Sequence, residues 1–219
     1  MQLRTAALAA LTFLAACEPA GGDAAAAPAD PGRAEAWEIG PVIRGRNYSE
    51  GAPLHPSPSR GGGWHFDIPQ APSGVHYVTF RHGPLLGKRR IVMRYRIDAA
   101  PGVRILPATD PALPSIITLY FQRRGDDWSG VGKYEGYRWF ATFASRMPIE
   151  AGEHEIVAPL DGLWSAVETS NARTNAPGFR AALAEADRVG FVLGGGNGYG
   201  HGAWATGPAR LTVLEYRVE

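Results

Sequence analysis

Short runs of hydrophobic and polar residues alternate along most of the chain. The run from Ile91 to Asp98, with the sequence IVMRYRID, places an apolar side chain at every second position, which predicts a strand with one buried face. Further β-rich runs are predicted at residues 75–80, 115–122, 137–143, 154–158, 188–193 and 209–218. The run at 115–122 is apolar on both faces, which favours a central place in its sheet. In the last run the apolar phase reverses, and a β-bulge near Val213 explains that shift.

A helical pattern stands out between Pro177 and Asp187. Pro177 suits the first turn, Asn175 is a suitable N-cap, and Phe179 begins an apolar face with a helical period. Turn signals rich in glycine and proline separate the strands elsewhere. Many short strands with one late helix predict an all-β fold, an antiparallel β-sandwich or jelly roll with a short helix near the C-terminus.

Composition narrows the function classes. The chain has 219 residues, a net charge of +1, 45% hydrophobic and 20% charged residues, which is ordinary for a globular protein. A charge this close to zero gives no electrostatic reason to bind nucleic acid. The single cysteine excludes a disulfide framework and a cysteine-based zinc site.

The first 16 residues have the pattern of an export signal. Arg4 precedes an apolar stretch that is shorter than the about 20 residues needed to span a bilayer. The sequence Leu14-Ala15-Ala16-Cys17 resembles the bacterial lipoprotein signal, which implies cleavage before Cys17, lipidation of this cysteine and membrane attachment through the lipid. The alternative is an ordinary cleaved signal in which Cys17 is incidental.

Two consequences follow from that resemblance. In bacterial lipoproteins an Asp after the cysteine tends to retain the protein at the inner membrane, and Glu18 is not that residue, so the outer membrane is favoured. Residues 17–36 hold no aromatic or large aliphatic side chain and are expected to form a disordered tether. Residues 37–219 are then expected to form a single β-sandwich domain.

The C-terminal third carries a second resemblance. A strand end at Leu160–Trp164, a helix containing Phe179, the strand Val189–Leu193 and a glycine loop before the final strand follow one another. This order is similar to that of galactose-binding-like jelly rolls, which occur in many carbohydrate-binding modules. The resemblance implies a fold and leaves the ligand open.

The glycine loop at 194–204 is the most distinctive segment. It formally matches G-x-G-x-x-A, but no helix follows it, so a nucleotide-binding loop is excluded. Two interpretations remain open. The glycines allow a tight connection whose aromatic residues fill the end of the sandwich, or the loop presents a ligand surface that stacks on sugar rings and hydrogen-bonds their hydroxyls. The candidate ligand residues here are Asn197, Tyr199, His201 and Trp204.

The segment from Asp126 to Tyr134 is the second candidate. Asp127, Trp128 and Tyr134 could bind a sugar, and the alternative is a solvated hairpin turn. The two neighbouring aspartates supply too few oxygens for Ca²⁺ on their own, so no metal ligand set and no cofactor are predicted, although bound Ca²⁺ stays open.

Catalytic motifs are absent from the sequence. There is no G-x-S-x-G, no H-E-x-x-H and no cysteine to spare for nucleophilic chemistry. The leading hypothesis is therefore a membrane-anchored envelope lipoprotein that binds carbohydrate or another envelope component without catalysis. One alternative is a small polysaccharide lyase or glycoside hydrolase in which His201 acts as acid or base. Another is a structural or assembly lipoprotein that binds protein partners.

Overall fold

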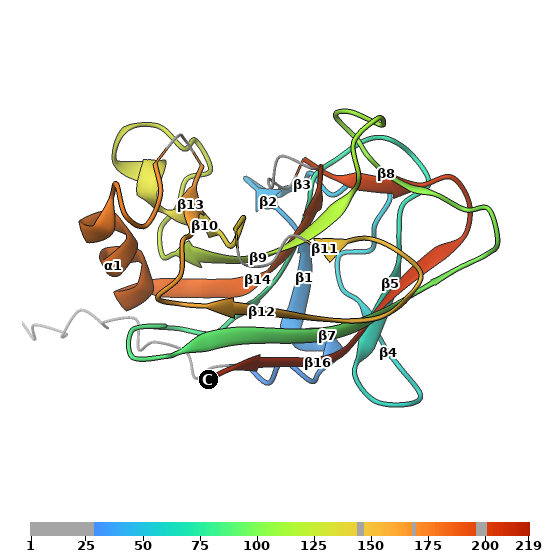
Figure 1. Ribbon diagram of the computed structural model, residues 1–219, viewed down its shortest axis with the longest axis horizontal. Helices are drawn as coiled ribbons and strands as arrows, with labels where there is room; N and C mark the ends of the chain where they lie inside the picture. Colours follow the sequence, from blue (N-terminus) through green and yellow to red (C-terminus); the bar gives the residue numbers. More distant parts are fainter. Residues whose placement is uncertain (1–28, 144–146, 168–169, 196–200) are drawn as a thin grey trace, which may run out of the picture.

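The computed structural model describes residues 29–143, 147–167, 170–195 and 201–219, and two antiparallel sheets face each other in it (Figure 1). The larger is a seven-stranded sheet with the order β1-β6-β14-β9-β10-β13, and β11 pairs beside β10 on β9. Its strands are β1 (Trp37–Gly40), β6 (His76–Arg81), β9 (Ile116–Arg123), β10 (Arg138–Phe140), β11 (Met147–Pro148), β13 (Ser165–Ala166) and β14 (Ala186–Gly194).

The second sheet has five strands in the order β12-β7-β16-β5-β4. They are β4 (Ser57–Pro58), β5 (Trp64–Asp67), β7 (Arg90–Ala99), β12 (Gly152–Pro159) and β16 (Ala209–Val218). Two small sheets flank the sandwich, formed by β2 (Val42–Ile43) with β3 (Arg46–Asn47) and by β8 (Ile105–Pro107) with β15 (Ala203–Ala205). Short 3-10 helices occur at η1 (Ala34–Ala36) and η2 (Gly132–Gly136), and α1 covers Ala176–Ala184.

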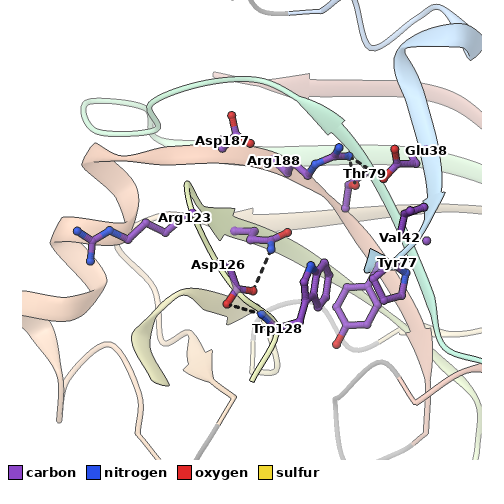
Figure 2. A pocket seen from close by; sticks show the side chains of 13 residues that line it. Glu38, Val42, Tyr77, Thr79, Arg123, Asp126, Trp128, Asp187 and Arg188 are labelled. Carbon is purple, nitrogen blue, oxygen red and sulfur yellow. Dashed lines mark hydrogen bonds and ion pairs between the residues drawn. The ribbon is translucent and has the colours of Figure 1, made fainter. Parts of the chain in front are cut away.

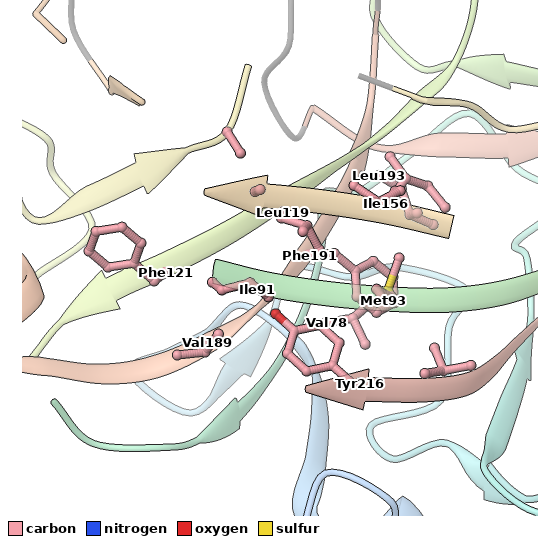
Figure 3. Packing of buried hydrophobic residues seen from close by; sticks show 14 of the residues in the cluster. Val78, Ile91, Met93, Leu119, Phe121, Ile156, Val189, Phe191, Leu193 and Tyr216 are labelled. Carbon is pink, nitrogen blue, oxygen red and sulfur yellow. The ribbon is translucent and has the colours of Figure 1, made fainter. Parts of the chain in front are cut away.

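The hydrophobic core fills the space between the two sheets (Figure 3). Phe191 comes from the seven-stranded sheet, and Met93 and Tyr216 come from the five-stranded one. Trp37 and Trp64 pack on each other with ring centroids 4.5 Å apart. The hydroxyl of Tyr216 donates to the carbonyl oxygen of Gly190 at 3.0 Å and joins the two sheets through a buried hydrogen bond. The expected all-β sandwich with one short helix is confirmed.

Several local predictions are also confirmed. The alternating run at 91–98 lies in β7, and the run that is apolar on both faces is β9, which lies between β14 and β10. The register of β16 shifts between Val213 and Glu215, at the expected bulge. The side chain of Asn175 caps α1 by accepting from the backbone N–H of Gly178 at 3.1 Å.

The predicted end of the helix is wrong. The helix stops at Ala184 instead of continuing to Asp187, because Ala186 pairs with Arg123 and already belongs to β14. Ala186 is fully buried in β14, and its apolar character would fit the predicted helical face equally well.

The outer face of the five-stranded sheet is covered by exposed ion pairs. Examples are Arg94–Glu215 at 3.9 Å, Arg96–Glu153 at 3.7 Å and Arg210–Asp67 at 2.7 Å. Such exposed pairs are typical of a solvated surface and contribute little stability. The outer face of the seven-stranded sheet differs, because Tyr77, Tyr120, Phe140 and Val192 form a buried cluster on it and Trp128, from the segment between β9 and β10, packs against that cluster.

Candidate functional site

Aromatic side chains gather on the outer face of the seven-stranded sheet. Alternation along β6, β14, β9 and β10 turns Tyr77, Val192, Tyr120 and Phe140 away from the main core, and these four form a separate buried cluster. The half-buried Trp128, from the segment between β9 and β10, packs against this cluster. A second layer of apolar packing therefore lies outside the sandwich core.

A pocket of about 150 Å³ opens beside this cluster (Figure 2). The rings of Trp128 and Tyr77 form one wall, with centroids 5.2 Å apart and an angle of 84° between their planes. Burial raises the pKa of Tyr77 to about 12, so its hydroxyl stays protonated. The other lining residues are Glu38, Gly40, Pro41, Val42, Thr79, Gln122, Arg123, Gly125, Asp126, Asp187 and Arg188.

The backbone at Trp128 is strained. Its φ is +68°, a left-handed conformation that bulky residues rarely adopt. Two contacts hold it there: the backbone N–H donates to Asp126 Oδ1 at 3.2 Å, and Arg138 Nη2 donates to the Trp128 carbonyl oxygen at 3.0 Å. Strained backbones of this kind persist where the surrounding structure fixes them, and they cluster at ligand sites.

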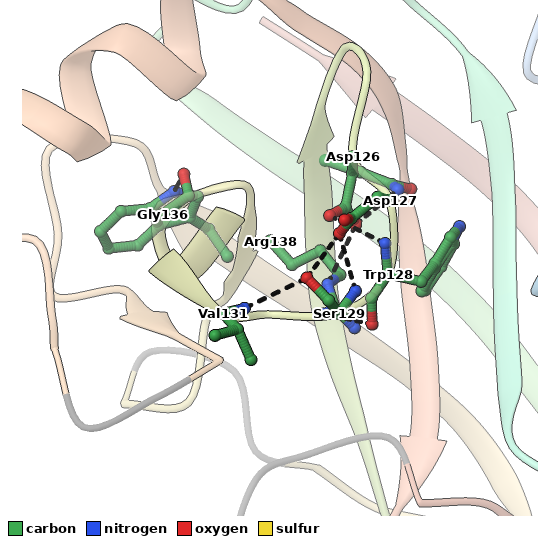
Figure 4. A network of polar contacts seen from close by, with 9 residues as sticks. Asp126, Asp127, Trp128, Ser129, Val131, Gly136 and Arg138 are labelled. Atoms are coloured by element: carbon green, nitrogen blue, oxygen red, sulfur yellow. Dashed lines mark hydrogen bonds and ion pairs between the residues drawn. The ribbon is translucent and has the colours of Figure 1, made fainter. Parts of the chain in front are cut away.

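A buried ion pair lies beneath this segment (Figure 4). Arg138 Nε lies 3.0 Å from Asp126 Oδ2, with the two side chains 8% and 0% exposed. Gln122 Nε2 donates to the same carboxylate oxygen at 2.9 Å. Burial raises the pKa of Asp126 above its ordinary value, and Arg138, the Trp128 N–H and Gln122 oppose that rise. Through these contacts the Asp126 carboxyl group fixes the Trp128 segment on the sheet.

The charges that line the pocket are compensated. Each acidic or basic lining side chain lies within 4.0 Å of an oppositely charged group, in the pairs Glu38–Arg188 at 3.1 Å, Arg123–Glu185 at 2.8 Å, Asp187–Arg81 at 3.5 Å and Asp126–Arg138 at 3.0 Å. Arg188 Nη1 also donates to Thr79 Oγ1 at 3.3 Å. The pocket therefore presents polar groups without a dominant charge.

The structure places the three candidates of the 126–134 segment differently. Trp128 lies on the pocket wall. Asp127 is exposed, and its Oδ1 accepts hydrogen bonds from the backbone N–H and hydroxyl of Ser129 at 2.8 and 2.6 Å. Tyr134 lies in η2 and packs edge-on against Tyr137 with centroids 5.0 Å apart. Asp127 and Tyr134 do not line this pocket.

The glycine-loop candidates lie elsewhere. Trp204 belongs to β15, where it pairs with Leu106 of β8 and is half-buried, and His201 is exposed. Neither lines the Trp128 pocket. Asn197 and Tyr199, like the lipidation candidate Cys17, lie outside the described residues, so their roles stay predictions.

Several pocket residues escaped the sequence analysis, among them Glu38, Tyr77, Gln122 and Arg188. They come from four strands that meet only through long-range pairing. One signal was available for β6 and β9, because strands with apolar residues at successive positions bury both faces. A strand of that kind indicates that another segment of the chain covers the outer face of its sheet.

Within the described ranges, no three His, Cys, Asp or Glu side chains come together in a group that could hold a metal ion. In the same ranges, no helix has the length and hydropathy needed to cross a membrane. No family model matches the sequence, and no curated protein matches it. The fold and the pocket define the class as an antiparallel β-sandwich with an aromatic, charge-compensated pocket on a sheet face.

Proposed function

We propose that the pocket beside Trp128 binds a carbohydrate without catalysis. We further propose that the chain is an exported bacterial lipoprotein, anchored through Cys17, that displays this pocket at the cell envelope. The observation that carries the binding proposal is the aromatic wall of Trp128 and Tyr77 with polar groups around it. An aromatic face packs on the C–H face of a sugar ring, while nearby polar side chains hydrogen-bond the ring hydroxyls.

The small volume of the pocket indicates that it contacts only a small part of a carbohydrate chain. Its volume of about 150 Å³ is below the about 300 Å³ at which ordinary small-molecule sites begin. The pocket therefore suits one sugar ring at a time, and weak binding is expected from each copy of the protein. Many copies tethered to one membrane would raise the effective concentration and offset that weakness.

The state of Asp126 supports binding without chemistry. A general acid or base needs a proton site within reach of the substrate. Asp126 is the buried carboxyl group of this pocket, and its contacts with Trp128, Gln122 and Arg138 are made within the protein. Glu38 is paired with Arg188. These two carboxyl groups hold the pocket together, which fits a binding role.

The anchoring proposal rests on the sequence Leu14-Ala15-Ala16-Cys17 and on the tether expected after it, of which Ala34–Ala36 form η1 in the structure with Ala34 buried in the core. The order of elements between residues 160 and 219 supports the further proposal that the sandwich is galactose-binding-like. In such jelly rolls the fold leaves the ligand open, so the choice of carbohydrate depends on the Trp128 pocket alone.

The test is glycan binding by the full chain, purified in a detergent without a sugar headgroup. We expect a glycan array to give hits, and titration calorimetry to show that Trp128→Ala weakens binding at least tenfold. Tyr134→Ala is the matched control, since it removes a half-buried aromatic of the same segment that does not line the pocket. Trp128→Phe should retain part of the affinity.

Three outcomes would contradict the proposal. Equal binding by wild type and Trp128→Ala would remove the pocket from consideration. Shortened glycan chains after incubation would assign the protein to the lyases or hydrolases. Absence of any glycan hit, together with capture of one defined envelope protein, would support an assembly lipoprotein instead.

A further inference from the structure

Three buried polar atoms line up on the outer face of β9. They are Thr118 Oγ1, Tyr120 OH and Gln122 Oε1, and none has a hydrogen-bond partner among the described residues. Because they occupy alternate positions of one strand, they share a face and their Cα atoms are spaced about 7 Å apart. The three residues are at most 6% exposed.

A row of this kind is unusual in a folded protein. Buried polar groups nearly always have a partner, and a group without one destabilises the native state. Tyr216 shows the ordinary arrangement on the other side of the same sheet, where its hydroxyl donates to the Gly190 carbonyl oxygen. Other buried atoms without partners in the described residues, such as Tyr95 OH and Trp204 Nε1, belong to separate elements. On β9 they come from three alternate positions of one strand.

The row adjoins the pocket. Gln122 lines it, and the Tyr120 ring lies 5.1 Å from the ring of Tyr77, which forms the pocket wall. Burial raises the pKa of Tyr120 well above its ordinary value. Smaller electrostatic effects on this pKa come from four charged or polar groups, Tyr77, Arg138, Asp126 and Arg188. The phenol is therefore within electrostatic reach of groups around the pocket. In the sheet register Gly190 lies between Thr79 and Tyr120 and contributes no side chain of its own there.

The chemistry of the row identifies a class of ligand. A hydroxyl, a phenol and an amide oxygen are uncharged, and the first two both donate and accept hydrogen bonds. The charged groups around the pocket are already paired. A carboxylate or sulfate on the ligand would meet no free cation among these groups and would lose its hydration. Sugar hydroxyls would satisfy the polar atoms of the row.

We propose that the row Thr118, Tyr120 and Gln122 is a sugar subsite that continues the Trp128 pocket along β9, and that it selects uncharged sugars over uronates. This inference rests on the proposed carbohydrate binding. Trp128 is only half-buried and packs on the cluster that contains Tyr120, so the pocket wall and the row lie against each other.

The test compares Tyr120→Phe and Thr118→Val with the wild-type full chain. Each change removes a hydroxyl that has no partner among the described residues and keeps the shape of the side chain. We expect unfolding in urea to show equal or greater stability, and calorimetry to show affinity for the bound glycan reduced at least fivefold. Tyr95→Phe is the matched control, because it removes from β7, in the other sheet, a buried phenol that has no partner among the described residues, and it should leave affinity unchanged.

The selectivity is tested with soluble β-glucan, galactan and mannan, each before and after oxidation of its C6 hydroxyl to a carboxylate. We expect the polymers that bind to lose at least tenfold in affinity on oxidation. Equal affinity for both forms would overturn the selectivity for uncharged sugars.

The two proposals fail in different ways. If Trp128→Ala loses binding while Tyr120→Phe and Thr118→Val bind like wild type, the subsite is wrong and the binding pocket stands. Clear destabilisation by Tyr120→Phe would show that its hydroxyl has a partner within the protein, which also overturns the subsite. If Trp128→Ala binds like wild type, or none of the polymers binds, both proposals fail.

Discussion

The guanidinium of Arg138 lies over the indole ring of Trp128, 5.1 Å from its centroid, and Nη2 donates to the carbonyl oxygen of the same residue. One side chain on β10 thus holds both the ring and the backbone of the residue that forms the pocket wall. Because Arg138 is also paired with Asp126, its removal would release the whole segment.

Arg138→Met is expected to destabilise the protein strongly. It leaves the buried Asp126 carboxyl group without its cation, which typically costs about 3–5 kcal/mol. Asp126→Asn in the same chain should recover part of that loss, because it removes the uncompensated charge. Urea unfolding of the two single variants and the double variant measures the coupling. Arg94→Met, from an exposed pair, should cost less than about 1 kcal/mol. Similar losses at both arginines would show that the Asp126 pair is not specially buried.

Stability is expected to fall in acid because of His76. This side chain is 1% exposed, its Nδ1 lies 2.6 Å from Ser49 Oγ, and burial lowers its pKa to about 4. The unfolded chain takes up a proton below about pH 6.5, whereas the folded one resists it. The stabilising contribution is therefore complete above pH 6.5 and is lost between pH 6.5 and 4, by about 3 kcal/mol.

Urea unfolding between pH 7.5 and pH 4 measures this contribution. In His76→Asn the free energy of unfolding should change less with pH between 6.5 and 4 than in the wild type. The raised pKa of Asp126 acts in the opposite direction, since the folded protein then takes up that proton more readily than the unfolded chain. An unchanged slope in His76→Asn would rule out this histidine as the source.

The left-handed backbone at Trp128 predicts an inverted order of stability between two truncations. Alanine at a φ of +68° keeps a strain of about 1–2 kcal/mol, whereas glycine adopts that conformation freely. Trp128→Gly should therefore be at least as stable in urea as Trp128→Ala, although glycine is elsewhere the less stable residue. A clearly less stable glycine variant would mean that residue 128 does not have a positive φ. Both variants should bind glycan at least tenfold more weakly than the wild type.

Cys17→Ser is expected to abolish membrane anchoring. Each buried methylene of an attached acyl chain contributes about 0.8 kcal/mol, so losing the acyl chains should move the protein out of the detergent phase in phase partitioning. Mass spectrometry of the N-terminal peptide shows whether Cys17 carries lipid. A wild-type chain with an unmodified Cys17 would contradict the anchoring proposal.

The sequence predicted the parts of the fold that depend on near neighbours. The alternation in β7, the bulge in β16 and the Asn175 cap each arise within a few residues. The end of α1 was missed because Ala186 is buried equally well in a helix or a strand, and only its pairing with Arg123 decides.

The pocket depends on relationships that no local pattern contains. Trp128 was recognised because it stands out among polar neighbours, but its partner Tyr77 lies on β6, two strands from β9 in the sheet order. Glu38 and Arg188 meet only because β1 and β14 both pair with β6. Contacts of this kind depend on strand order, and a single sequence does not specify it.

The distribution of tryptophans gives the protein its own optical reporter. Of its six tryptophans, four are fully buried, and Trp128 and Trp204 are half-buried. Quenchers dissolved in water reach Trp128 and Trp204 far more readily than the four buried tryptophans. In a Trp204→Phe background, fluorescence that iodide can quench would come mainly from the pocket wall. A bound sugar ring would then protect Trp128 from iodide, so the reduced quenching of its fluorescence would report occupancy of the pocket without any label.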